Sequence, residues 1–198
     1  MLDRDRQAAT PFLAPGERLR AAATVSLAPG IPHPPAELLP PRQPAEWERK
    51  LARPIGLLRR ARALVDPVAS ATGAVGDRIA DAVPDAAWHG RGMDGGWTSA
   101  AGRFVLRWYE DGAKGDCLLA LTDRRLLLLA DRAKPWQLDP VYAPHHELPR
   151  HETAALRRNP KGVLQRGRVD LHFPDGSWAA LTTPLPSTAD ELAAAYAS

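Results

Sequence analysis

The stretch Leu119-Ala-Leu-Thr-Asp-Arg-Arg-Leu-Leu-Leu-Leu129 decides the fold that we expect for this chain. Two apolar runs flank Thr122-Asp123-Arg124, and threonine and aspartate side chains hydrogen-bond neighbouring backbone in tight turns. We therefore predict a β-hairpin with one strand over residues 116–121 and a second over residues 125–130. The second strand is rich enough in leucine to be buried on both faces.

Short strands and turn signals continue after this hairpin. We predict strands over residues 136–142, 146–148 and 153–158, and then a hairpin of residues 163–173 and 177–183 around Pro174-Asp175-Gly176. An Asp-Gly pair between alternating strands is the strongest short hairpin signal. A final helix is predicted from Ser187, as its N-cap, to Ala197, with Leu192 and Tyr196 on its apolar face.

Alternating apolar residues also predict strands further upstream. Within residues 11–27, a strand follows the turn signal Pro15-Gly16, and its alternate positions are Leu19, Ala21, Ala23 and Val25. Residues 103–109 alternate in the same way, with Phe104, Leu106 and Trp108 on one face. We predict a strand there, followed by a hairpin loop over residues 110–115.

The region between these strands has a different texture. Seven prolines lie between residues 29 and 44, which indicates an extended linker over residues 28–44. Apolar residues at alternating spacings of three and four predict a helical segment over residues 45–83, which Pro67 should kink or interrupt. Residues 84–102 are rich in glycine and are predicted to form a loop.

Three features resemble bacterial pleckstrin-homology-like domains, also described as PH-like or GRAM-like. They are the Thr-Asp-x-Arg hairpin, the opening Pro15-Gly16-Glu17, and the Asp-Gly hairpin before a terminal helix. The resemblance covers residues 11–27 and 103–198. It implies an α+β fold in which an antiparallel β-barrel or sandwich is closed by a C-terminal helix. Residues 28–102 would then be an insertion between the first and second strands.

The turn that carries this resemblance consists of Thr122, Asp123 and Arg125, and we assign it a structural role. Its threonine and aspartate would bond neighbouring backbone, and its arginine would cover a strand edge. In eukaryotic relatives, basic residues in the first inter-strand loop bind phosphoinositides. The chain has no matching lysine-rich loop motif, so we do not transfer that activity to it.

The net charge of the chain has a single origin. The 198 residues include 26 basic and 23 acidic side chains, for a formal charge of +3. Residues 46–66 alone supply this excess, and the candidate binding residues there are Arg49, Lys50, Arg53, Arg59, Arg60 and Arg62. A basic amphipathic helix over residues 54–66 can bind an anionic membrane surface or an acidic partner, or can be a solvated face. We do not expect nucleic-acid binding.

The sequence offers few candidates for catalysis. His145, His146 and His151 form the densest group of metal-ligand residue types, but their spacing does not match the helical HExxH motif. The GxGxxG pattern at residues 90–95 lacks the strand and helix that a dinucleotide site requires. The single cysteine, Cys117, excludes an intrachain disulfide. We therefore predict no catalytic residues, no metal and no cofactor.

These observations predict a non-enzymatic PH-like interaction module that binds an unknown protein partner or another copy of itself. The first alternative is a peripheral membrane module that uses helix 54–66, and the second is an enzyme with a histidine-containing site near residues 145–151. We expect a cytoplasmic location, with peripheral membrane attachment as the alternative. The longest apolar run, residues 192–197, is far shorter than the roughly 18 residues needed to span a bilayer.

Overall fold

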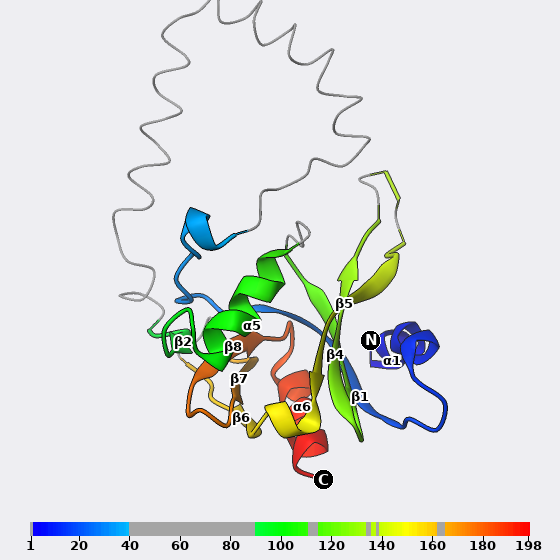
Figure 1. The fold of residues 1–198 in the computed structure, drawn as a ribbon. Helices are drawn as coiled ribbons and strands as arrows, with labels where there is room; N and C mark the ends of the chain where they lie inside the picture. Colours follow the sequence, from blue (N-terminus) through cyan, green and yellow to red (C-terminus); the bar gives the residue numbers. More distant parts are fainter. Residues whose placement is uncertain (1, 40–89, 111–114, 134–135, 138, 162–164) are drawn as a thin grey trace, which may run out of the picture.

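The structure is a computed structural model that describes residues 2–39, 90–110, 115–133, 136–137, 139–161 and 165–198 (Figure 1). The predicted helical segment over residues 45–83 and the six basic candidates between Arg49 and Arg62 lie outside the described residues. The division into a β domain and an insertion over residues 28–102 therefore stays a prediction.

The described chain folds as an α+β protein with an antiparallel sheet of eight strands. The strands are β1 (Leu19–Leu27), β2 (Met93–Asp94), β3 (Cys117–Thr122), β4 (Arg125–Asp131), β5 (Tyr142–Pro149), β6 (Ala155–Arg158), β7 (Arg168–His172) and β8 (Trp178–Thr182). The α-helices are α1 (Leu2–Ala9), α5 (Ala100–Tyr109) and α6 (Pro186–Ala197). Three 3-10 helices are η1 (Thr10–Phe12), η2 (Ala36–Leu38) and η4 (Arg150–Glu152).

Strand β1 joins two meanders into one sheet. Its residues 21–25 pair with β3, whereas Ser26 and Leu27 pair with Thr182 and Leu181 of β8. The strand order is β5-β4-β3-β1-β8-β7-β6, with β2 added to β8. Within the described residues β5 and β6 do not pair with each other, so the sheet is open and the closed barrel expected from the sequence is not formed.

The predicted hairpins are present where local turn chemistry specifies them. Strands β3 and β4 pair from Cys117 opposite Ala130 to Leu121 opposite Leu126, around the Thr-Asp turn. Strands β7 and β8 pair around the Asp-Gly turn, where Gly176 has a φ of +83° that favours glycine. Both faces of β4 are buried, as its run of leucines predicts.

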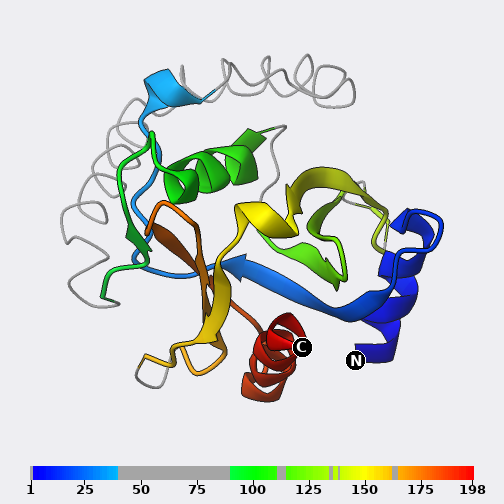
Figure 2. The same cartoon turned by 60° about the horizontal axis from the view of Figure 1, so that its bottom comes forward.

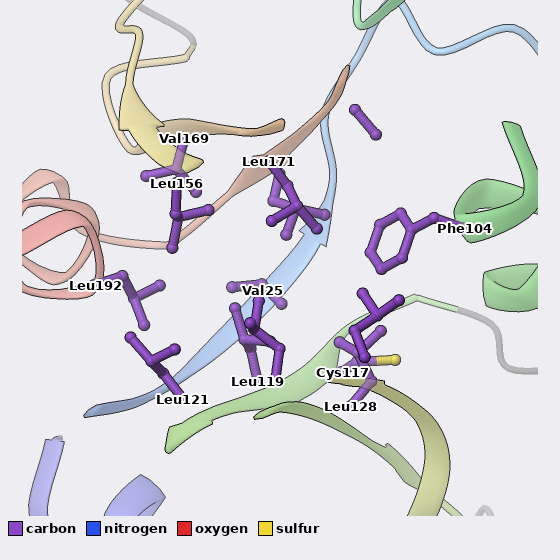
Figure 3. Close-up of a cluster of buried hydrophobic side chains, with 14 of the residues drawn as sticks. Val25, Phe104, Cys117, Leu119, Leu121, Leu128, Leu156, Val169, Leu171 and Leu192 are labelled. Atoms are coloured by element: carbon purple, nitrogen blue, oxygen red, sulfur yellow. The ribbon is translucent and has the colours of Figure 1, made fainter. Parts of the chain in front are cut away.

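The main core lies between the two meanders (Figure 3). Alternate residues of β1, β3 and β4 point into it, including Val25, Leu119 and Leu128, and Leu171 enters from β7. Helix α6 closes one side with Leu192, and α5 closes the other with Phe104. The two helices therefore cap opposite sides of one core.

A second, smaller core lies on the outer face of β1, β3 and β4, beneath α1 (Figure 2). Leu118, Leu127 and Leu129 point to this face and are at most 3% exposed. Helix α1 also bonds the edge of β1, since Asp5 accepts from the Thr24 amide at 3.1 Å and Arg6 donates to the Arg20 carbonyl at 3.1 Å. The sequence analysis did not predict this helix.

The strand predicted over residues 103–109 is wrong, because these residues belong to helix α5. Ala101, Phe104, Val105 and Trp108 are buried at helical spacing, whereas Leu106 is only partly buried. Ser99 caps the helix by accepting a hydrogen bond from the Gly102 amide at 3.1 Å. The hairpin predicted between residues 103–109 and β3 is therefore not formed, because α5 takes the place of its first strand.

Three boundaries also differ from the predictions. The described residues between Trp136 and Val141 are not in a strand, and β5 runs continuously through residues 142–149. Helix α6 begins at Pro186 after the N-cap Leu185, with no side-chain cap, so Ser187 is not the N-cap. Proline suits this first position because its missing amide would have no helical partner there.

A backbone hydrogen bond joins residues 30 and 92, which lie near the two ends of the long connection between β1 and β2. The Gly92 amide donates to the Gly30 carbonyl at 2.9 Å, and Ala180 of β8 bonds Ala28 and Gly92. A Cβ on Gly30 would lie 2.0 Å from the Gly90 carbonyl oxygen, and one on Gly92 would lie 2.5 Å from the Ile31 nitrogen. We call this backbone contact of Gly30, Gly92 and Ala180 the clasp.

Candidate functional site

The Thr122-Asp123-Arg125 turn lies in a buried polar network with Glu17. Thr122 Oγ1 donates to Glu17 Oε1 at 2.8 Å, and Arg125 Nη2 donates to Glu17 Oε2 at 2.7 Å. Asp123 Oδ1 accepts from the Arg18 amide at 3.0 Å. These contacts attach the segment before β1 to the β3–β4 hairpin, and we call this set of residues the Glu17 latch.

The arginine of the latch also reaches a third strand. Arg125 Nη1 donates to Glu147 Oε2 of β5 at 2.6 Å. The side chain of Glu17 is only 1% exposed and that of Arg125 is 18% exposed. The hydrogen bonds from Arg125 lower the pKa of Glu17 to about 2, against an opposing effect of burial. Glu17 is thus held as a carboxylate by the fold.

The three histidines of the sequence analysis are not brought together as one set. His146 and His151 line the same groove, whereas neighbouring His145 is not among the residues that line it. His145 is the extra residue at a register shift of β5, since Leu128 pairs with His146 and Leu129 pairs with Pro144. Over the described residues, no group of three or more His, Cys, Asp or Glu side chains could hold a metal ion.

The groove that contains His146 and His151 has a volume of about 540 Å³. Helix α5 forms one wall, β5 and η4 form the opposite wall, and the β7–β8 turn closes one end. Its lining residues are Ala100, Arg103, Phe104, Arg107, His146, Leu148, His151, Glu152, Phe173, Pro174 and Asp175. We call it the α5 groove.

The floor of the α5 groove is apolar and its rim is charged. Phe104, Leu148 and Phe173 are each at most 6% exposed, and the rings of Phe104 and Phe173 lie 5.9 Å apart. Burial, and then the nearby positive charge of Arg107, lower the pKa of His146 below its ordinary value. Both effects favour the neutral imidazole of His146 in the free protein.

Asp175 fixes the start of α5 against the β7–β8 turn. Its Oδ2 accepts from the Ala100 amide at 2.7 Å, and its Oδ1 accepts from the amide and the hydroxyl of Ser177. These hydrogen bonds lower the pKa of Asp175. The same Ser177 hydroxyl accepts from the Ala101 amide at 3.0 Å, so two amides of the first turn of α5 are bonded from this turn.

Replacing Ser99 by alanine is expected to lower the free energy of unfolding by about 1 kcal/mol, because it removes the N-cap of α5. Urea denaturation at pH 7 measures this change. Thr98→Ala is the matched control, since Thr98 contributes only its carbonyl to the contacts described here. An equal loss of stability in both variants would contradict the capping role of Ser99.

The described lining of the α5 groove offers guanidinium, imidazole and carboxylate groups over an apolar floor. Its described lining contains no serine, threonine or cysteine that could act as a nucleophile. Cys117 is buried in β3, and burial raises the pKa of its thiol to about 11, which makes the thiolate scarce. A guanidinium, an imidazole and an apolar floor are suited to holding an amphipathic anion.

The groove could not be predicted from sequence patterns, because its walls come from three separate segments. Arg103 and Arg107 lie four residues apart, a spacing that places them on one face of a helix and equally on one face of a strand, so it could not have identified the helix that forms one wall.

Comparisons with known proteins provide no assignment. No protein-family model matches the chain, and no curated protein matches it. None of the helices in the described part of the chain is long and apolar enough to cross a membrane.

Proposed function

We propose that this chain is a PH-like interaction module, non-enzymatic and cytoplasmic, that binds a protein partner or a second copy of itself through its inserted segment. Two antiparallel meanders joined by the first strand and followed by a terminal helix support the PH-like part of the proposal. The Glu17 latch gives each residue of the family-like turn a hydrogen bond to the segment that contains Glu17 and Arg18, which fits a structural function for that turn.

The clasp is the observation that carries the proposal. The backbones of residues 30 and 92 are hydrogen-bonded to each other beside β8. The two ends of the intervening segment are therefore attached to the sheet at one place. A segment inserted in this way can be presented to a partner without interrupting the pairing of β1 with β3. Its basic residues between positions 49 and 62 are the binding candidates, and they lie outside the described residues.

Excision of the insertion tests this proposal. Residues 40–89 are replaced by a Gly-Ser linker of about twelve residues, which can span roughly 40 Å. The full chain should associate with itself in light scattering, or should recover a partner in cross-linking from native cells, and the excised chain should lose that association while remaining folded. Equal association by both forms would contradict a binding role for the insertion.

A peripheral membrane function is the second candidate, and the confinement of the net charge of +3 to residues 46–66 favours it. In that case the full chain should co-sediment with vesicles of phosphatidylcholine containing phosphatidylserine. Arg59→Gln combined with Arg60→Gln and Arg62→Gln should weaken sedimentation, because each basic residue near an anionic surface contributes about 1 kcal/mol. Sedimentation that is indifferent to the phosphatidylserine content would eliminate this candidate.

A further inference from the structure

The α5 groove is a second site, separate from the inserted segment. Its volume of about 540 Å³ lies in the range of small-molecule pockets, roughly 300–1,000 Å³. Buried Phe104, Leu148 and Phe173 supply an apolar floor of the kind that holds an aromatic or aliphatic body. Whether the polar group of a ligand should be a cation or an anion depends on which charged side chains of the rim are already bonded to other parts of the protein.

The acidic groups of the rim are poorly placed to hold a cationic ligand. Asp175 already accepts hydrogen bonds from Ala100 and from the amide and hydroxyl of Ser177, and the positive charge of Arg103 lies nearby. Glu152 lies on η4 at the opposite wall and is exposed to solvent. Of the two carboxylates in the groove, Asp175 is therefore already hydrogen-bonded within the protein, and Glu152 is exposed to water.

The basic groups of the rim are more available. Arg107 is 58% exposed, and within the described chain it uses one terminal nitrogen, Nη1, to donate to Glu110 at 2.8 Å. An exposed ion pair of this kind contributes about 0–1 kcal/mol, so it can rearrange at little cost. A guanidinium has five N–H donors, which leaves a fork for a carboxylate.

We propose that the α5 groove binds a small organic carboxylate, with its apolar body on Phe104 and Phe173 and its carboxylate between Arg107 and His146. This arrangement places the hydrophobic part against buried Phe104 and Phe173, and the charge beside Arg107 and His146, which line the same groove. Arg103, four residues before Arg107 on α5, adds a second positive charge at the same wall.

Binding should be coupled to protonation of His146. The charged groups that act on this imidazole are Arg107, His145, Glu110 and Glu152, and burial together with the two basic groups disfavours its charged form. His151 shares the groove, as do Arg103 and Asp175. A bound carboxylate favours imidazolium, so His146 takes up a proton from solvent and the affinity rises as the pH falls toward the lowered pKa of His146.

The test uses 2-naphthoate as the probe and uncharged 2-naphthamide as its matched analogue, with the full chain and isothermal calorimetry or ligand-observed NMR. We expect 2-naphthoate to bind, and 2-naphthamide to bind about tenfold more weakly, because it lacks the charge-assisted hydrogen bond. Arg107→Gln should weaken 2-naphthoate about tenfold, and Glu152→Gln should strengthen it. Arg157→Gln, at an exposed arginine of β6, is the control and should change nothing.

Measuring the affinity at several pH values tests whether the charge of His146 contributes to binding. From pH 8 to pH 6 the affinity for 2-naphthoate should increase by about threefold or more, and His146→Gln should remove this increase. If 2-naphthoate fails to bind at millimolar concentration, if the amide binds equally well, or if Arg107→Gln and Arg157→Gln behave alike, the proposal is overturned. Excision of residues 40–89 should leave this binding intact, so its outcome is distinguishable from that of the proposed function.

Discussion

Replacing Arg168 by methionine is expected to lower the free energy of unfolding by about 3–5 kcal/mol. Arg168 is 1% exposed, and its Nε donates to Asp170 Oδ1 at 2.7 Å. Its other nitrogens donate to Gln165 Oε1 at 2.9 Å and to the Arg91 carbonyl at 3.0 Å. Methionine fills part of the volume but leaves the buried carboxylate of Asp170 without its cationic partner.

A second substitution tests whether the loss of stability comes from the unpaired carboxylate of Asp170. Asp170→Leu in the Arg168→Met background should recover much of the stability, because a buried pair replaced on both sides leaves no uncompensated charge. Arg157→Met, at an exposed position of the neighbouring strand β6, should change stability by less than about 0.5 kcal/mol. Guanidinium denaturation at pH 7 measures all three, and a loss below about 1 kcal/mol in Arg168→Met would contradict the assigned role.

Replacing Glu17 by glutamine is expected to lower the free energy of unfolding by about 2–3 kcal/mol at pH 7. The amide keeps the size of the side chain but cannot balance the guanidinium of Arg125, which donates to Glu17 through Nε at 2.8 Å and Nη2 at 2.7 Å. Charge-assisted hydrogen bonds of this kind are stronger than neutral ones. Loss of the Glu17 latch frees the segment before β1 from the β3–β4 hairpin.

The pH dependence of this effect follows from the lowered pKa of Glu17, which is about 2 in the folded protein against an ordinary value of 4.5. The folded state binds fewer protons than the unfolded state, so the stabilisation is complete above pH 4.5 and is lost as the pH falls toward 2. A shift of this size corresponds to about 3 kcal/mol. The stability difference between the native chain and Glu17→Gln should therefore shrink between pH 5 and pH 2 in urea denaturation, and a difference independent of pH would contradict the latch.

The parts of the fold that could be predicted are those with local causes. The β3–β4 hairpin depends on a Thr-Asp turn between two apolar runs, and the β7–β8 hairpin depends on Asp175-Gly176. Both signals lie within a few residues of the strands that they join, so neither requires knowledge of the rest of the chain.

Helix α5 shows why the remainder could not be predicted in the same way. Phe104 and Trp108 fit a strand period of two and also a helical spacing of four, so this segment satisfies both patterns. The choice depends on the Ser99 cap and on Asp175, whose carboxylate comes from 75 residues along the chain to bond the Ala100 amide. A tertiary contact of that range leaves no local sequence signal.

The same limit applies to the candidate sites. Glu17 and Arg125 are 108 residues apart, and only the pairing of β1 with β3 brings their surroundings together. The α5 groove combines a helix, an edge strand and a turn, and each segment alone has an ordinary polar and apolar composition. The cluster of basic residues between positions 49 and 62 could be recognised from the sequence because its members lie close together along the chain.

We expect the two meanders and their helices to form a self-supporting body from which the insertion departs at the clasp. The most direct measurement is a comparison of ¹H–¹⁵N correlation spectra of the full chain and of the chain with residues 40–89 replaced by the Gly-Ser linker. We predict that the amide signals of β1, β3, β4, β7 and β8 superimpose, with changes confined to residues near positions 39 and 90. A collapsed spectrum typical of an unfolded chain would contradict it.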